Sequence, residues 1–305
     1  MSYWYNAFGL RIESSIDLLG VTCPAGDAEL TVTSCPLSSG SIPSGPLFWG
    51  TDECSDESVA VIPRVARFRA RQGIRVSIEA DDRLPECDLR AIVISTALPL
   101  AIQQLDGLLL EASAFRWGRK VFLLVGRGPC GKSSLAALMA DAGAELLADS
   151  HCMIRRRSDG TPVTDPAFPH VRLWPAQIEE LIGNWPDPVP VRTGLEKRMF
   201  AAPNRFARNR LEIDGLFFLR RGVEKEFCLR RLALQETLQL LALASDRLRS
   251  SVSADRRIAW LKTASSLAAL PFCHLFRWPQ ENSTVLESRD RLLDFLQHHH
   301  SAVPA

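Results

Sequence analysis

Hydrophobic and polar residues alternate with a period of two through most of the chain before residue 86. The segments "ELTVTSC" and "RVARFRA" show this alternation, and "GIRVSIEA" follows the second of them across Gln72-Gly73. Such alternation is typical of half-buried strands, and the glycine between two strands indicates a hairpin turn. The composition of "SSGSIPSGP" (38–46) indicates a loop. We therefore predict a smaller, β-rich N-terminal domain over residues 1–86.

From about residue 88 the apolar stretches become longer. "DLRAIVISTALPLAIQQL" has helical spacing, and Pro99 within it marks a kink or the start of a second helix. The apolar segments "GLLLEASAF" and "KVFLLVG" predict two strands that form a hairpin at "RWGR". The helix "KSSLAALMADAG" follows, with Gly143 as its C-terminal cap, and then the buried strand "AELLAD".

The rest of the chain continues to alternate between strands and helices. We predict strands in "RLEIDGLFFLRR" and "FCHLFRWP", and helices in "LRRLALQETLQLLALAS", "ADRRIAWLKTASSLAAL" and "STVLESRDRLLDFLQ". This order predicts an α/β fold with a mixed sheet and flanking helices. We place the domain boundary near residues 86–105, the second domain at 87–298 and a polar tail at 299–305. The histidines at 298–300 are interpreted as solvated rather than metal-binding.

The composition excludes several classes of protein. The 305 residues are 46% hydrophobic and 23% charged with a formal net charge of +1, so no large basic field is available for a nucleic acid or a membrane surface. No apolar run approaches the length of about 18 residues that a spanning helix needs. The N-terminal segment lacks a signal-peptide pattern, which predicts a cytoplasmic protein. The eight cysteines are scattered without a CxxC pair, which favours reduced thiols over disulfides or a zinc site.

The segment "GRGPCGKSS" follows directly after the apolar run "VFLLV". It matches the phosphate-loop pattern G-x-x-x-x-G-K-[ST] at every fixed position and stands between a predicted strand and a predicted helix, as that pattern requires. Its glycines let successive backbone N–H groups face one anion, and the start of the helix presents more of them. We therefore predict that it binds a nucleotide rather than merely linking a strand to a helix. The candidate binding residues are Gly126, Arg127, Gly128, Pro129, Cys130, Gly131, Lys132, Ser133 and Ser134.

Three residues near the end of this loop have specific candidate roles. Lys132 supplies a mobile positive charge for the β- and γ-phosphates, and the hydroxyl of Ser133 can bind Mg²⁺. Asp149 ends the strand "ELLAD", and the carboxyl ends of strands are where ligands bind in α/β sheets. We expect Asp149 to approach the phosphates, within reach of Mg²⁺ or of an acceptor hydroxyl. The alternative is a solvated aspartate that only ends a strand.

Residues 108–152 resemble the catalytic domain of bacterial HPr kinase/phosphorylase. The resemblance rests on "GLLLEASAF…VFLLVGRGPCGKSSLAALMADAGAELLADS". The segments "YNAFGLRIESSIDL", "VRLWPAQIEEL" and "EKR" are similar to a narrower branch, the HPr-kinase-like proteins encoded with lasso-peptide biosynthesis genes, which phosphorylate the precursor peptide. The resemblance implies a P-loop fold of the HPr-kinase-like or PEP-carboxykinase-like type. It also implies a serine kinase that uses ATP and Mg²⁺, with Ser133 and Asp149 as metal ligands and Asp149 as the catalytic base.

The chain departs from this family at two positions. Glu111 in "LEAS" stands where the family has a histidine, and Ser150 stands where the family has the second of two aspartates. Glu111 is a candidate substitute ligand or acid–base partner, and the alternative is a strand-end glutamate that pairs with an arginine. Loss of the second acid weakens the metal site that the resemblance implies.

Phosphoryl transfer also needs positive charge around the migrating group. The candidates are Arg172 in "HVRLWP", and Lys197 with its neighbour Arg198 in "LEKRM"; only five of the 36 basic residues are lysines, which adds weight to Lys197. The alternative for each is a solvated surface cation. Residues 155–210 are rich in Pro, Gly and Arg, and we expect a mobile substrate loop there.

Three functions remain open from the sequence. The leading hypothesis is an ATP/Mg²⁺-dependent kinase that phosphorylates a serine hydroxyl of a peptide or small protein. The expected acceptor is a serine near the C-terminus of a lasso-peptide precursor. The second is a nucleotide-binding regulatory or assembly module without phosphoryl transfer. The third is an HPr-type protein kinase/phosphorylase that also runs the reverse reaction. A peptide or small-protein partner is expected, no nucleic-acid or membrane partner is expected, and assembly into a homo-oligomer stays open.

Overall fold

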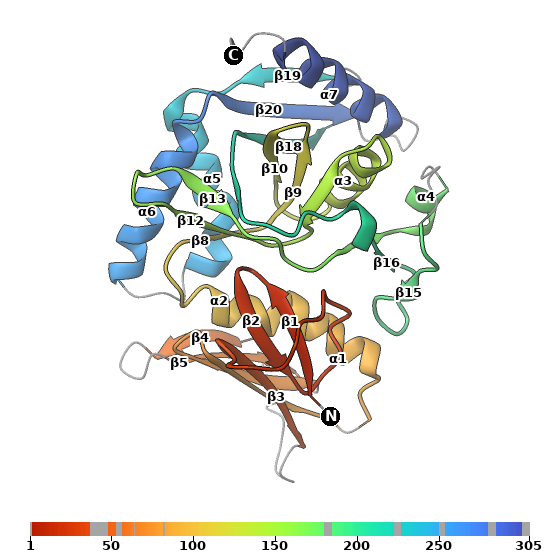
Figure 1. Cartoon of the computed structure of the whole chain (residues 1–305), viewed down its shortest axis with the longest axis vertical. Coiled ribbons are helices and arrows are strands. Elements are labelled where there is room, and N and C mark those ends of the chain that lie inside the picture. The colour runs from red at the N-terminus through yellow and green to blue at the C-terminus, as the bar shows by residue number, and fades with distance from the viewer. Residues whose placement is uncertain are drawn as a thin grey trace.

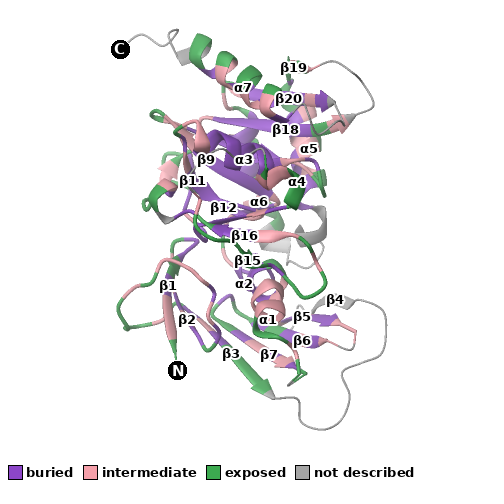
Figure 2. Cartoon of the chain, turned by 90° about the vertical axis from the view of Figure 1, so that its right-hand side faces the viewer, coloured by how far each residue is buried: buried purple, intermediate pink, exposed green. Residues whose placement is uncertain are grey.

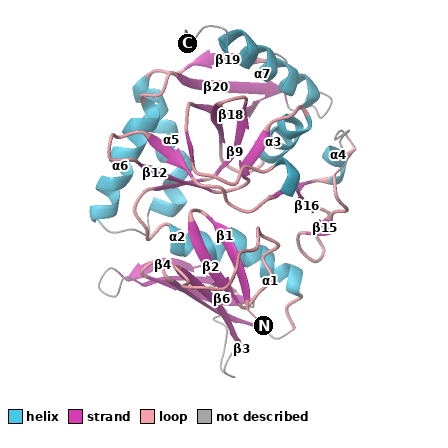
Figure 3. Cartoon of the chain, in the orientation of Figure 1, coloured by secondary structure: helices cyan, strands magenta, loops and turns pink. Residues whose placement is uncertain are grey.

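The computed structural model describes nine stretches of the chain: residues 2–36, 48–52, 57–63, 65–81, 83–179, 185–222, 227–249, 254–279 and 285–300. The loop predicted at 38–46 lies outside these stretches. The fold is a mixed α/β structure with several sheets and helices (Figures 1 and 3).

The N-terminal part forms one seven-stranded sheet with the order β1-β2-β3-β7-β6-β5-β4. Its strands are β1 (Tyr3–Ala7), β2 (Leu10–Ser14), β3 (Leu30–Pro36), β4 (Phe48–Asp52), β5 (Glu57–Ile62), β6 (Ala66–Arg71) and β7 (Arg75–Ala80). The predicted hairpin is present between β6 and β7, where Gln72 and Gly73 both have positive φ values. Inward-facing residues alternate with outward-facing ones along β6 and β7, as the period-two pattern predicted.

A helical segment covers one face of this sheet and separates it from the rest of the molecule (Figures 1 and 3). It consists of α1 (Glu86–Ile92), a π-helix (Val93–Ala97) and α2 (Leu98–Ile102). Pro99 lies in the first turn of α2, directly after the π-helix. The proline therefore marks the start of a second helix, one of the two alternatives that the sequence left open.

A six-stranded sheet with the order β11-β9-β10-β18-β20-β19 forms the centre of the remaining chain. Its strands are β9 (Ala112–Trp117), β10 (Lys120–Val125), β11 (Glu145–Ala148), β18 (Gly215–Gly222), β19 (Cys228–Arg231) and β20 (Phe272–Pro279). Strands β10, β18 and β20 run parallel, whereas β9, β11 and β19 pair antiparallel with their neighbours. The hairpin expected at "RWGR" joins β9 to β10, with Trp117 opposite Lys120.

Helices pack on the faces of this sheet. Helix α3 (Lys132–Asp141) contacts β9, β10 and β11, and α7 (Val285–His300) packs on α3. Helices α5 (Leu234–Arg249) and α6 (Ala254–Ala268) pack against each other and against the short strand β8. Figure 2 shows that α3 is buried at the centre while α7 has exposed residues along its length. Helix α7 includes two residues, 299 and 300, that we had assigned to the tail.

The segment "GLLLEASAF" is two strands rather than one. β8 (Leu108–Leu110) pairs with β12 (Cys152–Arg156), whereas β9 belongs to the central sheet. With β13 (Pro162–Thr164) and β17 (Leu211–Glu212), β8 and β12 form a four-stranded sheet of order β17-β13-β12-β8. Glu111 is the bend between them. The uniform apolar character of the segment hides this break, because both strands are buried and neither shows alternation.

The described parts of residues 155–210, namely 155–179 and 185–210, contain short strands and helices where we expected a mobile loop. In this region the structure has strands β12 (Cys152–Arg156), β13 (Pro162–Thr164), β14 (His170–Leu173), β15 (Val189–Pro190) and β16 (Arg198–Ala201), the short helix α4 (Pro175–Ile178) and a 3-10 helix (Pro203–Arg205). β14, β16 and β15 form a three-stranded sheet, and β13 pairs with β17 (Leu211–Glu212). Short strands paired at long range leave no local periodicity, and the many prolines and arginines of this region favour a loop when the sequence is considered alone.

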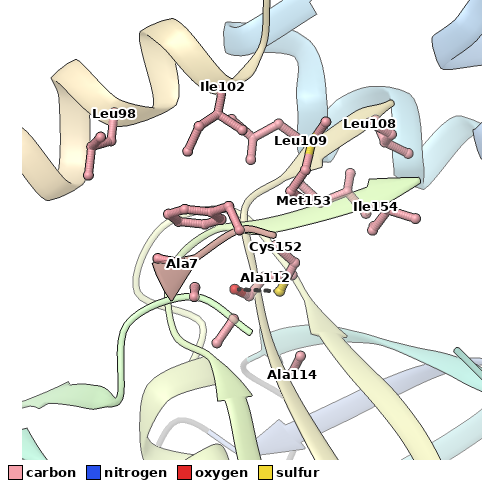
Figure 4. Packing of buried hydrophobic residues seen from close by; sticks show 14 of the residues in the cluster. Ala7, Leu98, Ile102, Leu108, Leu109, Ala112, Ala114, Cys152, Met153 and Ile154 are labelled. Carbon is pink, nitrogen blue, oxygen red and sulfur yellow. Dashed lines mark hydrogen bonds between the residues drawn. The ribbon is translucent and has the colours of Figure 1, made fainter. Parts of the chain in front are cut away.

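One hydrophobic cluster joins the two halves of the molecule. Figure 4 shows Ile102 of α2 facing Leu109 and Met153 of the adjoining sheet, whereas Leu98 lies farther along the helix. Ala7 of β1 belongs to the same cluster. The backbone N–H of Phe8 also donates to the carbonyl of Pro166 at 2.7 Å. The N-terminal sheet is therefore packed on the rest of the chain through a shared core. No helix among the described residues is both long and apolar enough to cross a membrane.

Candidate active site

The loop between β10 and α3 has the backbone geometry that its glycines allow. Gly128 and Gly131 have φ values of 61° and 93°, in the left-handed region that non-glycine residues rarely adopt. A Cβ atom on Gly131 would lie 1.7 Å from the ring of Trp278 at the end of β20. Position 131 thus requires a glycine for two reasons, the positive φ of the backbone and the close approach of Trp278. The loop passes directly into α3, whose first N–H groups remain available to an anion.

Lys132 is buried and its ammonium group is bound within the loop. Nζ donates to the carbonyl of Gly126 at 2.5 Å and to the carbonyl of Gly128 at 3.2 Å. It also pairs with Oε1 of Glu111 at 3.1 Å. Sγ of Cys130 lies 3.7 Å from Nζ, and burial raises the pKa of this thiol although Lys132 opposes the shift. Glu111 therefore contacts the loop lysine, whereas we had considered an arginine as its alternative partner.

The carboxylate of Asp149 lies at the start of α3. The residue follows β11, is buried, and accepts a hydrogen bond from Oγ of Ser133 at 2.8 Å through Oδ1. The same oxygen accepts from Oγ of Ser113 at 2.7 Å, and Oδ2 accepts from the backbone N–H of Arg172 at 3.2 Å. The structure thus brings Asp149 and Ser133 into direct contact. These are the two residues that we named as candidate metal ligands.

Ser150, at the position of the family's second aspartate, has a strained backbone. Its φ is 82°, in the left-handed region that is unfavourable for a serine. Its hydroxyl accepts a hydrogen bond from the guanidinium of Arg172. Arg172 is therefore held against both residues of the pair, by its backbone on Asp149 and by its side chain on Ser150.

A cavity of about 130 Å³ opens in front of the loop and α3, and we call it the phosphate cavity. The residues that line it are Gly128, Pro129, Gly131, Lys132, Ser133, Ser134, Arg172, Trp174, Gln177, Lys197 and Arg221. Cations come from several directions: Lys132 from α3, Arg172 from β14, Lys197 from the turn before β16 and Arg221 from the end of β18. This distribution of charge suits a group with several anionic oxygens.

Lys197 is partly buried near the other cations. Burial lowers the pKa of Lys197. The negative charge of Asp149 raises this pKa, whereas the positive charges of Arg172 and Lys132 lower it further. Its ammonium lies 6.0 Å from the ring centroid of Trp174, at the limit of a cation–π contact. Lys197 is thus coupled electrostatically to the residues around Asp149 rather than being a solvated surface cation.

Two other residues named from the sequence, Arg127 and Arg198, lie elsewhere. Arg127 is exposed and faces away toward a second cavity, and Arg198 pairs with Leu173 in the strand ladder between β14 and β16. Ser134 is buried and lines the phosphate cavity, as expected of a loop residue. His170, the histidine of β14, is buried, which lowers its pKa to about 4, so the imidazole is neutral at pH 7.

Sequence reasoning missed Ser113, Trp174 and Arg221. Ser113 belongs to the same "LEAS" segment as Glu111, but its bond to Asp149 depends on the pairing of β9 with β11. Arg221 ends a strand parallel to β10, and the rule that ligands bind at the carboxyl ends of such strands was sufficient to find it. Trp174 directly follows β14 and is 41% exposed, which is unusual for so large an apolar ring.

The donor set around Ser133 and Asp149 fits Mg²⁺. Both residues offer hard oxygen atoms, and Mg²⁺ in nucleotide sites is held by one or two protein oxygens together with phosphate oxygens and water. Among the residues that the structure describes, no cluster of three or more His, Cys, Asp and Glu side chains is placed to hold a metal without a nucleotide.

Comparisons with known proteins give a distant structural match. No protein-family model matches the sequence, and no curated protein matches it. Among solved structures, the chain is similar to the Hpr(Ser) kinase/phosphatase from Coxiella burnetii, with 11% identity and a TM-score of 0.31 over 62% of this chain and 98% of the other. A similarity this low does not identify what the chain does.

Proposed function

We propose that the chain is an ATP- and Mg²⁺-dependent kinase that transfers the γ-phosphoryl group to a serine hydroxyl of a peptide or small protein. The observation that carries this proposal is the contact between Asp149 and Ser133 at the start of α3, beside the ammonium of Lys132. This arrangement places a carboxylate at a helix N-terminus that is otherwise suited to anions. A phosphate-binding loop alone would not need such a carboxylate.

The two oxygens of Asp149 have separate tasks in this proposal. Oδ1, which contacts Ser133, faces the site where Mg²⁺ would be held by these two residues and would neutralise charge on the phosphates. Oδ2, which lies beside β14, accepts the proton of the acceptor serine. The serine oxygen then forms a bond to the γ-phosphorus, the bond between this phosphorus and the bridging oxygen breaks, and ADP leaves.

Lys132 and Glu111 act as a pair before the nucleotide binds. Glu111 and the loop carbonyls satisfy the buried ammonium of Lys132, which prevents an uncompensated charge. When phosphates enter the loop, Lys132 exchanges these partners for phosphate oxygens. Glu111 thus holds the lysine at the loop until the nucleotide binds.

The acceptor in this proposal is a peptide, namely a lasso-peptide precursor phosphorylated near its C-terminus. The resemblance of "VRLWPAQIEEL" and "EKR" to the lasso-associated branch supports this, and so does the exposed ring of Trp174 beside Arg172 and Lys197. Arginine binds a terminal carboxylate through paired hydrogen bonds, and an exposed indole offers a surface for an extended chain.

The test is phosphoryl transfer to defined acceptors. The protein is incubated with ATP, Mg²⁺ and candidate precursor peptides, and mass spectrometry locates any added phosphoryl group. We expect phosphate on a serine near the C-terminus. Efficient phosphorylation of a sugar or nucleoside, with none of any peptide, would overturn the proposed acceptor.

Ser150 favours a second candidate, a nucleotide-binding module that transfers no phosphate. It replaces a charged acid with a neutral hydroxyl that is already engaged by Arg172. ADP release separates the two candidates: tight ATP binding without turnover on any acceptor supports the module, and acceptor-dependent ADP release supports the kinase. Release of inorganic phosphate from a phosphoserine peptide would instead support a phosphatase, and formation of pyrophosphate from that peptide and added inorganic phosphate would support a phosphorylase.

A further inference from the structure

A second cavity, of about 360 Å³, lies on the other side of the phosphate loop. Residues of strands β10, β18, β19 and β20 and of helix α5 line it. Gly126 and Arg127 line this second cavity, whereas Gly128 and Pro129, the next residues of the same loop, line the phosphate cavity. One short loop therefore borders two cavities.

The two cavities differ in chemistry. The phosphate cavity is lined by cations and backbone N–H groups, as described above. The second cavity has apolar walls that include Phe218, Leu240 and Leu275, and Gln239 offers an amide. Charged residues also line it, namely Arg127, Arg220, Arg230, Glu236 and Arg277. Its volume and its mixture of apolar walls with polar and charged groups suit a small molecule.

The order of strands in the central sheet indicates on which side of the phosphate loop the acceptor binds and on which side the rest of the nucleotide binds. Strand β10 leads into the loop. Asp149 follows β11, which lies on one side of β10 with β9 between them. The second cavity is built on β18 and β20, which lie on the opposite side of β10. In phosphoryl transfer the acceptor and the leaving group lie roughly in line on opposite sides of phosphorus. With the acceptor beside Asp149, the remainder of the nucleotide extends toward β18 and β20.

We infer that the second cavity binds the nucleobase and ribose of the nucleoside triphosphate whose phosphates bind the loop. The inference rests on the phosphate-loop part of the proposed function. The flat base packs between Phe218 and Leu275 of the sheet and Leu240 of α5, and Gln239 is placed to hydrogen-bond its polar edge. Leu243 stands at the mouth of the cavity with 53% of its surface exposed, so a ligand that enters there covers an apolar side chain that is otherwise in water.

The test compares Leu243→Trp with a matched control, Leu261→Trp. Both leucines are exposed to a similar extent, 53% and 54%, on the neighbouring helices α5 and α6, and Leu243 lines the cavity whereas Leu261 does not. Because both positions face solvent, the larger ring is compatible with folding. The tryptophan at 243 fills the mouth of the cavity without adding charge.

Each variant is titrated calorimetrically with ATP and with inorganic tripolyphosphate, both with Mg²⁺. We expect Leu243→Trp to weaken ATP binding at least about tenfold, because the contact surface of the base is lost, and to leave tripolyphosphate binding unchanged. Leu261→Trp should match the wild type with both probes. Wild-type affinity of Leu243→Trp for ATP, or equal weakening of both probes, would overturn the inference.

Failure of the proposed kinase function gives a different result. If ATP binds in a manner that depends on Leu243 but no acceptor is ever phosphorylated, the base site stands and the kinase proposal falls. If the wild-type protein binds neither ATP nor tripolyphosphate, both proposals are overturned.

Discussion

Asp149 is the residue on which the proposed chemistry depends. Asn at this position keeps the size of the side chain and the bonds from Ser113 and Ser133, but it cannot accept a proton from a serine. We expect Asp149→Asn to lower the rate at least ~100-fold, the lower end for a lost general base, with ATP affinity changed less. Turnover and ATP affinity are measured on the same preparation, with the exposed Asp290→Asn on α7 as control. Normal turnover would make Asp149 a structural residue.

Lys197 gives the site a pH dependence that an ordinary lysine would not. Burial lowers the pKa of Lys197, so in the folded chain this group loses its proton at a lower pH than in the unfolded chain. The unfolded state binds more protons between the two pKa values, so this group adds stability as pH rises through that window. The phosphate cavity loses the positive charge of Lys197 over the same window, and we expect activity to fall there.

The variant Lys197→Arg isolates this effect because arginine stays charged across the accessible range. We expect the alkaline fall in the pH–rate profile to move to higher pH in the variant. An identical alkaline limb in both proteins would assign the fall to another group.

At the level of residues, the sequence predicted the side chains that carry charge but not their contacts. Lys132, Ser133 and Asp149 could be named because a fixed spacing and a strand end identify them. The bonds from Ser113 to Asp149 and from Glu111 to Lys132 depend on how β8, β9 and β11 are paired, which a single sequence does not specify.

At the level of elements, the start of α3 depends on β20. Gly131 has a positive φ and lies against Trp278 at the end of that strand, so alanine there adds both backbone strain and a steric clash. We expect Gly131→Ala to lower the free energy of unfolding by more than the ~1–3 kcal/mol of backbone strain alone, and to abolish nucleotide binding.

Gly143→Ala is the matched control for this prediction. Gly143 also has a positive φ, of 104°, but a Cβ atom there would meet nothing within 4 Å. Chemical denaturation of both variants separates strain from clash. Equal destabilisation of the two variants would show that Trp278 adjusts, and the proposed dependence of α3 on β20 would be wrong.

Elements with clearly bounded apolar runs could be predicted from the sequence, whereas the strands of the turn-rich segment could not. The hairpin β9–β10, helix α3 and strand β11 follow from apolar runs with clear boundaries. Residues 155–210 contain strands of two to five residues whose partners are distant in sequence, and their pairing stabilises them despite a composition rich in turn residues.

At the scale of the whole molecule, the shared core predicts cooperative unfolding. Ile102 is fully buried in α2 within the cluster that joins the N-terminal sheet to the rest of the chain. We expect one calorimetric transition for the whole chain, and Ile102→Ala should lower its midpoint by removing about 2–5 kcal/mol of stability. Ile258→Ala, at a position 55% exposed on α6, should change it little. Two transitions, only one of which shifts in Ile102→Ala, would show that the halves fold independently.

The central claim is that the loop after β10 binds the phosphates of a nucleotide through Lys132. A calorimetric titration with Mg²⁺ and ATP tests it on the wild type, Lys132→Ala and, as control, Lys262→Ala, whose lysine is exposed on α6. Hydrogen bonds from a charged group contribute about 1.5–3 kcal/mol, so we predict that Lys132→Ala binds ATP at least about tenfold more weakly than the wild type and that Lys262→Ala binds normally. Equal affinity of all three proteins for ATP would contradict the account.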